Sequence, residues 1–343
     1  MRHGESPPAD GEQDATERRG CLVHAMNMMG FAVDLRRQLA ARSGNMVGLG
    51  MNIGVIGLGR MGSIFAKRLI EQQHIVHVWN RSAERSKGFV RGEAILCDSP
   101  AAVVRKSEVV LVSLANETAL DEVYRRENGI LAGCSNGCHI VETSTVRPNF
   151  IIELAKSVTE SGGVFVDAPI LGTLGPAREG KVVVVAGGDD AAIERIRPVA
   201  SGLSRRLFHM GPIGSGSSMK LVVNMCLGVY WQSLGEAIAM GERRGLDLDR
   251  MLDVLVDSPI ATAALNGKLP VLRGAPAEIG FDITGVRKDL SSALITAHAE
   301  DVPAAAAAGA LAGFVAAIEG GFGGKDVASI VAFNRLRKAT PSC

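Results

Sequence analysis

The chain has 343 residues, 47% of them hydrophobic. That is more than one small core requires, so two domains are expected. The 37 lysines and arginines almost balance the 36 aspartates and glutamates, and the formal net charge is +1. With no basic field and no long basic run, the sequence argues against a nucleic-acid partner and favours a small-molecule substrate.

Residues 1–50 differ from the rest of the chain because they open with a polar stretch rich in Glu, Asp, Pro and Gly. A short amphipathic piece, Met26 to Ala41, follows this stretch. The acidic residues at the start argue against a mitochondrial presequence. We interpret residues 1–50 as a disordered extension, or as translated upstream sequence before a natural start at Met51.

From Met51, short β-branched runs alternate with segments of helical periodicity. This alternation predicts a parallel sheet covered by helices on both faces. Residues 51–213 are therefore predicted to form an N-terminal α/β domain with a Rossmann-type, doubly wound sheet. The strand candidates are 53–58, 75–79, 109–114, 139–142, 163–167 and 182–186.

The strand pattern stops at Gly214, and residues 214–335 are predicted to form an all-helical domain for substrate binding and oligomerisation. Its first helix is expected from Ser217 to Glu242, with the preceding Gly-Ser stretch as turn and N-cap and with Gly245 ending it. The alanine-rich stretch from Ala304 to Glu319 is expected to be a packed helix. Residues 336–343 are interpreted as a tail.

A glycine-rich motif directly follows the first predicted strand and precedes a predicted helix over Ser63 to Glu71. In this context a G-x-G-x-x-G sequence indicates a dinucleotide site. Its glycines permit a tight turn, close approach of the pyrophosphate and packing of helix on strand, and the helix N-terminus favours the anion. The predicted cofactor-binding residues here are Gly57, Leu58, Gly59, Arg60, Met61 and Gly62.

The end of the second predicted strand carries Asn80, Arg81 and Ser82, where NAD-binding sites usually carry an acidic residue. A carboxylate would repel a 2′-phosphate, whereas Arg81 can pair with it and its two neighbours can donate hydrogen bonds. These three residues therefore predict NADPH as the cofactor in preference to NADH. The alternative is a surface loop with a solvated arginine.

Five motifs occur in a family-specific order: Gly57 to Gly62, Thr143 to Pro148, Asp167 to Thr173, Gly214 to Gly216 followed by Lys220 and Asn224, and Lys288 to Leu290. By these motifs the sequence from Met51 to about Phe333 resembles the β-hydroxyacid dehydrogenase family, which includes 3-hydroxyisobutyrate dehydrogenase. Within the family it is most similar to the glyoxylate and succinic semialdehyde reductases.

The resemblance implies an NADP-dependent oxidoreductase that interconverts a small aldehyde acid and its hydroxy acid. It implies Lys220 as general acid and base and Asn224 as the residue that orients substrate and lysine. By the same resemblance, Thr145 contacts the nicotinamide side, Lys288 reaches the cofactor, and the substrate pocket is lined by residues 171–173 (Leu171, Gly172 and Thr173).

The residues themselves support the central pair. Lys220 and Asn224 are four apart on a predicted helix and project from one face, beside apolar Leu221, Val222 and Val223, which must pack elsewhere. The positive end of the helix dipole disfavours a lysine charge, which should lower the pKa of Lys220 towards the range of a general acid.

One position departs from the family pattern. Leu171 stands where the family usually has a serine whose hydroxyl helps hold a substrate carboxylate. An apolar side chain there predicts a bulkier or less acidic substrate than glyoxylate. Thr173 and backbone amides can still bind a carboxylate, so a short aldehyde acid remains the leading expectation.

Several residues have a structural alternative. Lys288 can belong to a surface charge cluster with Arg287 and Asp289, and Asp167 is expected to cap or bond the loop after its strand. The cysteines show no disulfide framework and are expected to be reduced thiols. A metal site made by Cys134, Cys138 and His139 would lack half of a zinc ligand set, so no metal is expected.

Two other functions stay open. The first is an imine reductase, which commonly lacks a lysine at the position of Lys220, and the second is a non-catalytic dinucleotide-binding scaffold. The lysine argues against both. No apolar stretch approaches the ~20 residues of a membrane span, so a cytoplasmic enzyme is expected, and its apolar helix faces predict a homodimer or homotetramer.

Overall fold

The computed structural model describes residues 50–337, except 83, 86–87, 89–93, 136 and 277. The predicted extension up to residue 49 and the predicted tail from residue 338 lie outside the described residues. The chain from Met51 onward forms one compact unit. None of the described helices combines the length and the apolar character that a membrane crossing requires.

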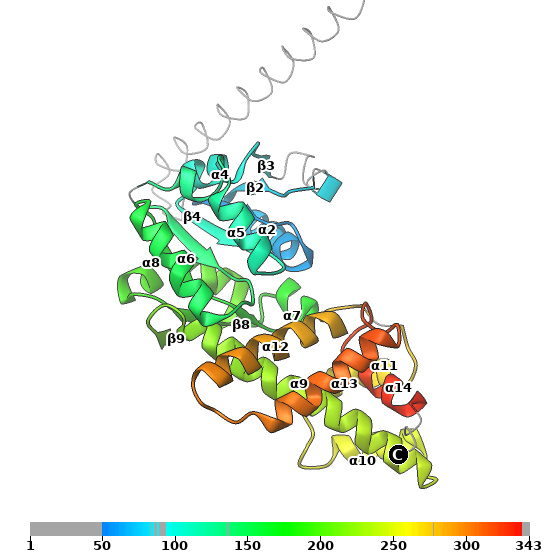
Figure 1. The fold of residues 1–343 in the computed structure, drawn as a ribbon. Coiled ribbons are helices and arrows are strands. Elements are labelled where there is room, and N and C mark those ends of the chain that lie inside the picture. Colours follow the sequence, from blue (N-terminus) through cyan, green and yellow to red (C-terminus); the bar gives the residue numbers. More distant parts are fainter. Residues whose placement is uncertain are drawn as a thin grey trace, which may run out of the picture. The chain divides into compact units, whose positions relative to one another are not determined.

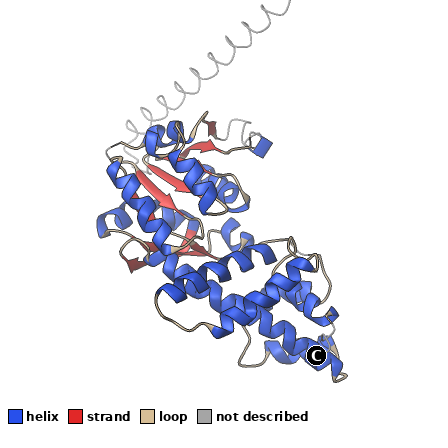
Figure 2. Cartoon of the chain, viewed as in Figure 1, coloured by secondary structure: helices blue, strands red, loops and turns tan. Residues whose placement is uncertain are grey.

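The described strands form one mixed sheet in the order β3-β2-β1-β4-β5-β6-β8-β7, with β9 paired to β8. Figure 2 shows the strands in red among the helices that pack around them. The pairings from β3 to β6 are parallel, β8 runs antiparallel to β6 and β7, and β9 is parallel to β8. The strands are β1 (Asn52–Ile56), β2 (Ile75–Trp79), β3 (Ile95–Leu96), β4 (Val109–Val112), β5 (His139–Glu142), β6 (Val164–Asp167), β7 (Ile170–Leu171), β8 (Val182–Gly187) and β9 (Ser204–Gly211).

Helices cover both faces of this sheet, because successive side chains of a strand point to opposite sides. On β4, Val109 and Leu111 join a core with α2 and α8, whereas Val110 and Val112 join a second core with α4, α5 and α6. The doubly wound arrangement is therefore confirmed. The helices are α2 (Arg60–Glu71), α4 (Pro100–Lys106), α5 (Glu117–Arg125), α6 (Pro148–Glu160), the short α7 (Leu174–Arg178) and α8 (Asp190–Leu203).

All six predicted strands occur, but the expectation of a purely parallel sheet is wrong. The two-residue strands β3 and β7 are too short to leave a sequence pattern. Most of β9 is exposed, and its sequence Ser-Arg-Arg-Leu-Phe-His-Met-Gly lacks the apolar run of a buried strand. The segment between β7 and β8 contains α7 (Leu174–Arg178), and nothing in the sequence signals that β8 runs antiparallel to β7.

After Gly211 the described residues form helices and loops, apart from an isolated bridge between Asp282 and Asp326. Figure 1 shows the long α9 leaving the sheet and lying beside α12 and α13. The predicted long helix and the alanine-rich helix are confirmed. The helices are α9 (Ser215–Arg243), α10 (Leu248–Val256), α11 (Ala263–Leu272), α12 (Ile283–Ala299), α13 (Ala305–Glu319) and α14 (Ser329–Leu336).

The helical part has its own apolar core, in which Trp231 of α9 and Phe314 of α13 are fully buried. Small residues let these helices approach closely. A Cβ atom on Gly228 would come within 2.9 Å of the Leu290 side chain, and one on Gly313 within 2.3 Å of Gln232. These contacts fix α9 against α12 and α13, and α12 carries Lys288.

The start of α9 is held by Asp167 at the end of β6. Its carboxylate accepts hydrogen bonds from the backbone N–H of Gly214 (3.1 Å) and of Ser217 (2.8 Å), and from the Ser217 hydroxyl (2.7 Å). Burial raises the pKa of Asp167 to about 6. The structural role expected for this residue is right, but it caps α9 rather than the loop after its own strand. The Gly-Ser stretch supplies no side-chain cap.

Candidate active site

The glycine-rich turn lies between the carboxyl end of β1 and the first residue of α2. Gly57 has a φ of +95°, and a Cβ atom on it would come within 2.3 Å of the Ser113 carbonyl oxygen. A Cβ atom on Gly62 would come within 1.9 Å of the Gly57 oxygen, whereas one on Gly59 would meet nothing within 4 Å. The turn therefore needs two glycines for its own packing and leaves open space at the third, as a pyrophosphate site requires.

The other side chains of this motif face away from that space. Leu58 is 2% exposed and belongs to the core, and Met61 packs against the same core. The Arg60 guanidinium donates to the Ile279 oxygen at 2.9 Å and to Asp282 at 3.4 Å. The cofactor role predicted for these three residues stays a prediction, and their backbone lies in the turn that faces the open space. The Arg60 side chain instead holds the loop before α12.

The predicted 2′-phosphate residues follow β2. The Asn80 side-chain oxygen accepts from Leu58 N–H at 3.0 Å and its amide donates to the Ser82 oxygen at 2.9 Å, so Asn80 stabilises both turns. The Arg81 side chain is 73% exposed and pairs with Glu122 of α5 at 3.3 Å. Arg81 is accessible to a phosphate, and Glu122 would compete with that phosphate for it.

Lys220 lies on the second turn of α9, and its Nζ donates to the backbone oxygen of Ile170 at 2.8 Å. Burial lowers its pKa to about 8; the Asp289 carboxylate opposes this shift, and the Lys288 ammonium adds to it. The lowered pKa agrees with the sequence-based expectation, and burial, which the sequence did not reveal, is its largest cause. The helix dipole acts mainly within the first turn, and burial is the larger effect here.

Asn224 is 5% exposed and donates from its side-chain nitrogen to Asp289 at 2.5 Å. Asp289 is 2% exposed and lies 2.9 Å from the Lys288 Nζ, which also donates to the Thr145 backbone oxygen. Hydrogen bonds and an ion pair thus connect α9, α12 and the loop after β5. The connected residues are Asn224, Asp289, Lys288 and Thr145. The alternative of a surface charge cluster fails at Asp289, which is buried. Sequence reasoning missed this residue, although the Lys-Asp-Leu motif contains it.

The loop that follows β6 brings the predicted pocket residues beside Lys220, because Ile170 directly precedes them. Leu171 is half-buried and pairs with Val183 of β8. Gly172 has a φ of +141°. A Cβ atom on Gly280 would come within 3.3 Å of Thr173, so the loop before α12 closes this side. The segment after β6, the start of α9 and the loop before α12 therefore lie next to one another around Lys220 and Thr173.

A second buried carboxylate lies behind the residues 143–145. Glu142, at the end of β5, is fully buried, accepts from the Tyr124 hydroxyl at 2.8 Å and from Ser144 N–H at 2.8 Å. Burial is the main cause that raises its pKa to about 7, and the charge of neighbouring Asp167 contributes to this rise. Ser144 in turn accepts from Leu114 N–H at 2.8 Å. This network holds in place the loop whose Thr145 contacts Lys288.

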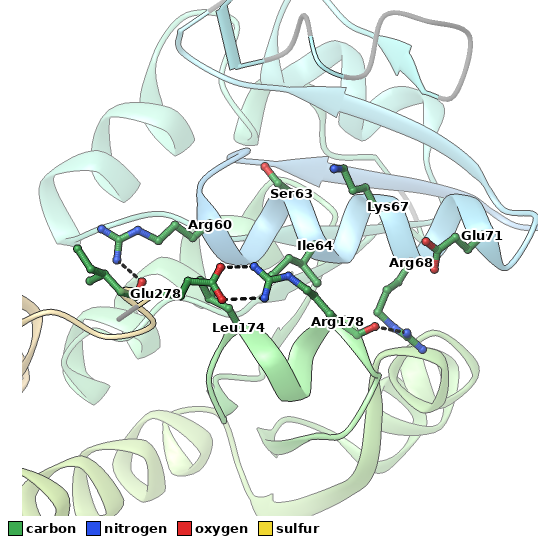
Figure 3. Close-up of a pocket in the computed structure, with 10 residues that line it drawn as sticks. Arg60, Ser63, Ile64, Lys67, Arg68, Glu71, Leu174, Arg178 and Glu278 are labelled. Atoms are coloured by element: carbon green, nitrogen blue, oxygen red, sulfur yellow. Dashed lines mark hydrogen bonds and ion pairs between the residues drawn. The ribbon is translucent and has the colours of Figure 1, made fainter. Parts of the chain in front are cut away.

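A cavity of about 740 Å³ lies on the outer side of α2, and neither Lys220 nor Asn224 lines it. Figure 3 shows Arg178 and Glu278 facing each other beside it, with Arg60 bonded to the same loop. These contacts hold the loop before α12 against α2 and α7. The cavity is lined by Arg60, Ser63, Ile64, Lys67, Arg68, Glu71, Leu174, Arg178, Glu278 and Ile279.

The expectation about metals concerns the cysteine pair before β5. Within the described part of the chain, no group of three or more histidine, cysteine or acidic side chains is arranged to hold a metal ion. His139, the third member of the possible cluster, bonds the Gly137 oxygen through Nδ1 at 2.9 Å.

Family models match both halves of the described chain. Residues 52–211 match the NAD-binding domain of 6-phosphogluconate dehydrogenase. Residues 214–333 match the model described as the NAD-binding part of NADP-dependent 3-hydroxyisobutyrate dehydrogenase.

Individual proteins are similar over most of the chain. Glyoxylate/succinic semialdehyde reductase 1 of Arabidopsis thaliana is 30% identical over 281 residues, covering 82% of this chain and 97% of that protein. Cytokine-like nuclear factor N-PAC of Xenopus tropicalis is 28% identical over 79% of this chain, which spans only 51% of that relative. The solved structure of Psf3 in complex with NADP⁺ and 2-OPP has a TM-score of 0.74 and 25% identity, covering 82% of this chain and 99% of that one.

Proposed function

Because this chain belongs to the β-hydroxyacid dehydrogenase family, dinucleotide-dependent oxidoreductases that act on CH–OH groups, we propose that it is an NADPH-dependent reductase of a small aldehyde acid. The reverse reaction oxidises the corresponding hydroxy acid. In this proposal Lys220 donates the proton during reduction and accepts it during oxidation. The nicotinamide of the bound cofactor supplies the hydride.

The observation that carries the proposal is the position of Lys220. Its Nζ donates to the backbone oxygen of Ile170, which directly precedes Leu171, Gly172 and Thr173, and its pKa is about 8. A group with that pKa is about nine-tenths protonated at pH 7 and can still release its proton, as a general acid and base must. An exposed lysine, with a pKa near 10.4, would serve poorly as a base at that pH.

The Asn224 and Asp289 pair supports this role by position and charge. Asp289 favours the protonated lysine electrostatically, while Lys288 opposes it. The Asn224 side-chain amide donates a hydrogen bond to Asp289, so the Asn224 side-chain oxygen is left to accept a hydrogen bond from another donor. We assign Asn224 and Asp289 as positioning residues, and Lys288 and Thr145 as the residues that meet the nicotinamide side.

The preference for NADPH is supported by Arg81 and by the absence of a carboxylate at residues 80–82. A 2′-phosphate is a better bidentate partner for the Arg81 guanidinium than the exposed Glu122 is, since the present pair is long and solvated. The backbone of Gly57 to Gly62 and the start of α2 would hold the pyrophosphate. NADH remains the less favoured cofactor.

The substrate class is proposed from the pocket loop and from the semialdehyde reductase relative. Thr173 is exposed and can donate to a carboxylate, whereas Leu171 offers only apolar contact. A four-carbon semialdehyde can place its carboxylate near Thr173 and its methylene groups against Leu171, whereas glyoxylate has no methylene group to make the apolar contact. An imine reductase or a non-catalytic scaffold would have no need of Lys220 in its half-buried position beside Ile170, which argues against both.

The test is a spectrophotometric screen of purified protein with NADPH and NADH against glyoxylate, succinic semialdehyde, methylmalonate semialdehyde, tartronate semialdehyde and a cyclic imine. We expect NADPH oxidation with an aldehyde acid, and loss of that activity by about 10²–10⁴-fold in Lys220→Ala with cofactor affinity little changed. Turnover of the imine alone, or no turnover by any substrate, would refute the proposal.

We also propose that the enzyme is a homodimer or homotetramer. Val222, expected from the sequence to be packed, is 50% exposed on α9, and Ile295 on α12 is 53% exposed. Exposed apolar side chains of this kind are stabilised by burial against a second copy. Light scattering coupled to size-exclusion chromatography measures the mass, and a monomer at micromolar concentration would contradict this part.

A further inference from the structure

The carboxylate of Glu122 on α5 lies beside the residues that follow β2. The Arg81 Nη1 donates to the Glu122 Oε2 at 3.3 Å, although the two residues are 41 apart in the sequence. Residues 80–82 contain no acidic side chain of the kind that an NAD site usually carries at the end of its second strand. Glu122 brings a negative charge to the same place from a different element, which no local sequence pattern could reveal.

Both members of this ion pair are accessible to a ligand. Leu120, Val123 and Tyr124 form the buried side of α5. The Glu122 side chain is 49% exposed and the Arg81 side chain is 73% exposed. An ion pair between side chains this exposed is worth ~1 kcal/mol or less, so a bound cofactor can replace either partner at little cost.

The neighbouring Asn80 is already engaged in holding the two turns. Its side-chain oxygen accepts from Leu58 N–H at 3.0 Å, and its amide donates to the Ser82 oxygen at 2.9 Å. A ribose hydroxyl needs an acceptor for its proton. A carboxylate has two oxygens and can accept several hydrogen bonds, so Glu122 is better suited to this role than Asn80.

We propose that Glu122 is a specificity-determining residue of the cofactor site and that it narrows the preference for NADPH which Arg81 creates. This inference rests on the proposed function, which places the adenosine end of the cofactor at Arg81. The 2′-phosphate of NADPH is attracted by the Arg81 guanidinium and repelled by the Glu122 carboxylate. The 2′-hydroxyl of NADH instead donates a hydrogen bond to this carboxylate. Glu122 therefore favours one cofactor and disfavours the other.

Isothermal titration calorimetry of the full chain with NADPH and with NADH, in the absence of substrate, tests this proposal. Glu122→Gln removes the charge and keeps the shape of the side chain. The Kd for NADPH should fall about two- to fivefold, because repulsion between exposed charges is worth up to ~1 kcal/mol. The Kd for NADH should rise about threefold, because a hydrogen bond to an amide oxygen is weaker than one to a carboxylate. High salt should reduce the gain for NADPH, since it screens exposed charges.

Asp121→Asn is the matched control, because Asp121 precedes Glu122 on α5, is 56% exposed and pairs with Arg125 at 2.8 Å. It removes the same charge from the same helix and should leave both Kd values nearly unchanged. The proposal is overturned if Glu122→Gln shifts both Kd values in the same direction, or shifts neither more than the control does. Those results leave the proposed function intact. An unaltered chain that binds neither cofactor would refute the proposed function and this inference with it.

Discussion

Replacing Asp289 by Asn removes the one negative charge that raises the pKa of Lys220. Asparagine keeps the shape and can still accept the hydrogen bond from Asn224. Loss of a nearby opposite charge shifts a pKa by about one unit, or ~1.4 kcal/mol, so the Lys220 pKa should fall from about 8 to about 7. At pH 8 the protonated fraction then drops from about one half to about one tenth, and the reduction rate falls about fivefold. At pH 6 it changes little.

Stability changes as well, because Lys288 loses its ion-pair partner and keeps the Thr145 oxygen. Since the Lys288 side chain is 30% exposed, water offsets part of the loss, and we expect a cost of about 1–2 kcal/mol. The assay is kcat/KM for NADPH-dependent reduction from pH 6 to 9, with urea unfolding alongside. Asp253→Asn, at a 69% exposed carboxylate paired with Arg273, is the control. A profile that coincides with the unaltered protein would refute the electrostatic role of Asp289.

Three further changes test the cofactor turn and the buried network. Arg81→Ala should raise the KM for NADPH at least about tenfold and that for NADH less than about twofold, because a charged phosphate contact is worth ~1.5–3 kcal/mol; equal effects on both cofactors would refute the assignment. Gly62→Ala places a Cβ atom within 1.9 Å of the Gly57 oxygen and should abolish NADPH binding in a fluorescence titration, and retained affinity would show that the turn is not the site. Glu142→Gln should stabilise the protein at pH 8 by up to about 3 kcal/mol, since the raised pKa of Glu142 gives stability that is present below about pH 4.5 and lost as pH rises through about 7. Urea unfolding at pH 8 and pH 5 measures this, and an equal effect at both would contradict it.

The sheet was largely predictable because its buried strands are continuous β-branched runs, such as residues 109–112. The sequence could not reveal β9, whose mostly exposed side chains need no apolar pattern, or the antiparallel β7, which has two residues. The prediction of a parallel sheet is wrong at β8, because its antiparallel neighbour β7 is too short to be recognised in the sequence. Periodicity records burial, and these strands are defined by backbone pairing instead.

The candidate site shows the same division. Lys220 and Asn224 were predicted together, because a spacing of four is fixed by the helix itself. Asp289 was missed, because nothing local distinguishes a buried carboxylate from the charged neighbours of Lys288 until α12 packs against α9. Arg60 was predicted to bind the cofactor as part of the glycine-rich motif, and the partners of its side chain lie more than 200 residues away in the sequence. Long-range contacts of this kind leave no spacing to read.

The central claim is that Lys220 transfers the proton, and the pH dependence of kcat/KM in both directions tests it most directly. With NADPH and the best aldehyde acid, the rate should be constant below about pH 8 and fall about tenfold per unit above it, while oxidation of the hydroxy acid rises through the same pKa. In Lys220→Ala most of the activity should be lost, and the remaining kcat/KM should no longer change around pH 8 in either direction. A variant that keeps the same pH dependence, or comparable turnover, would contradict the account.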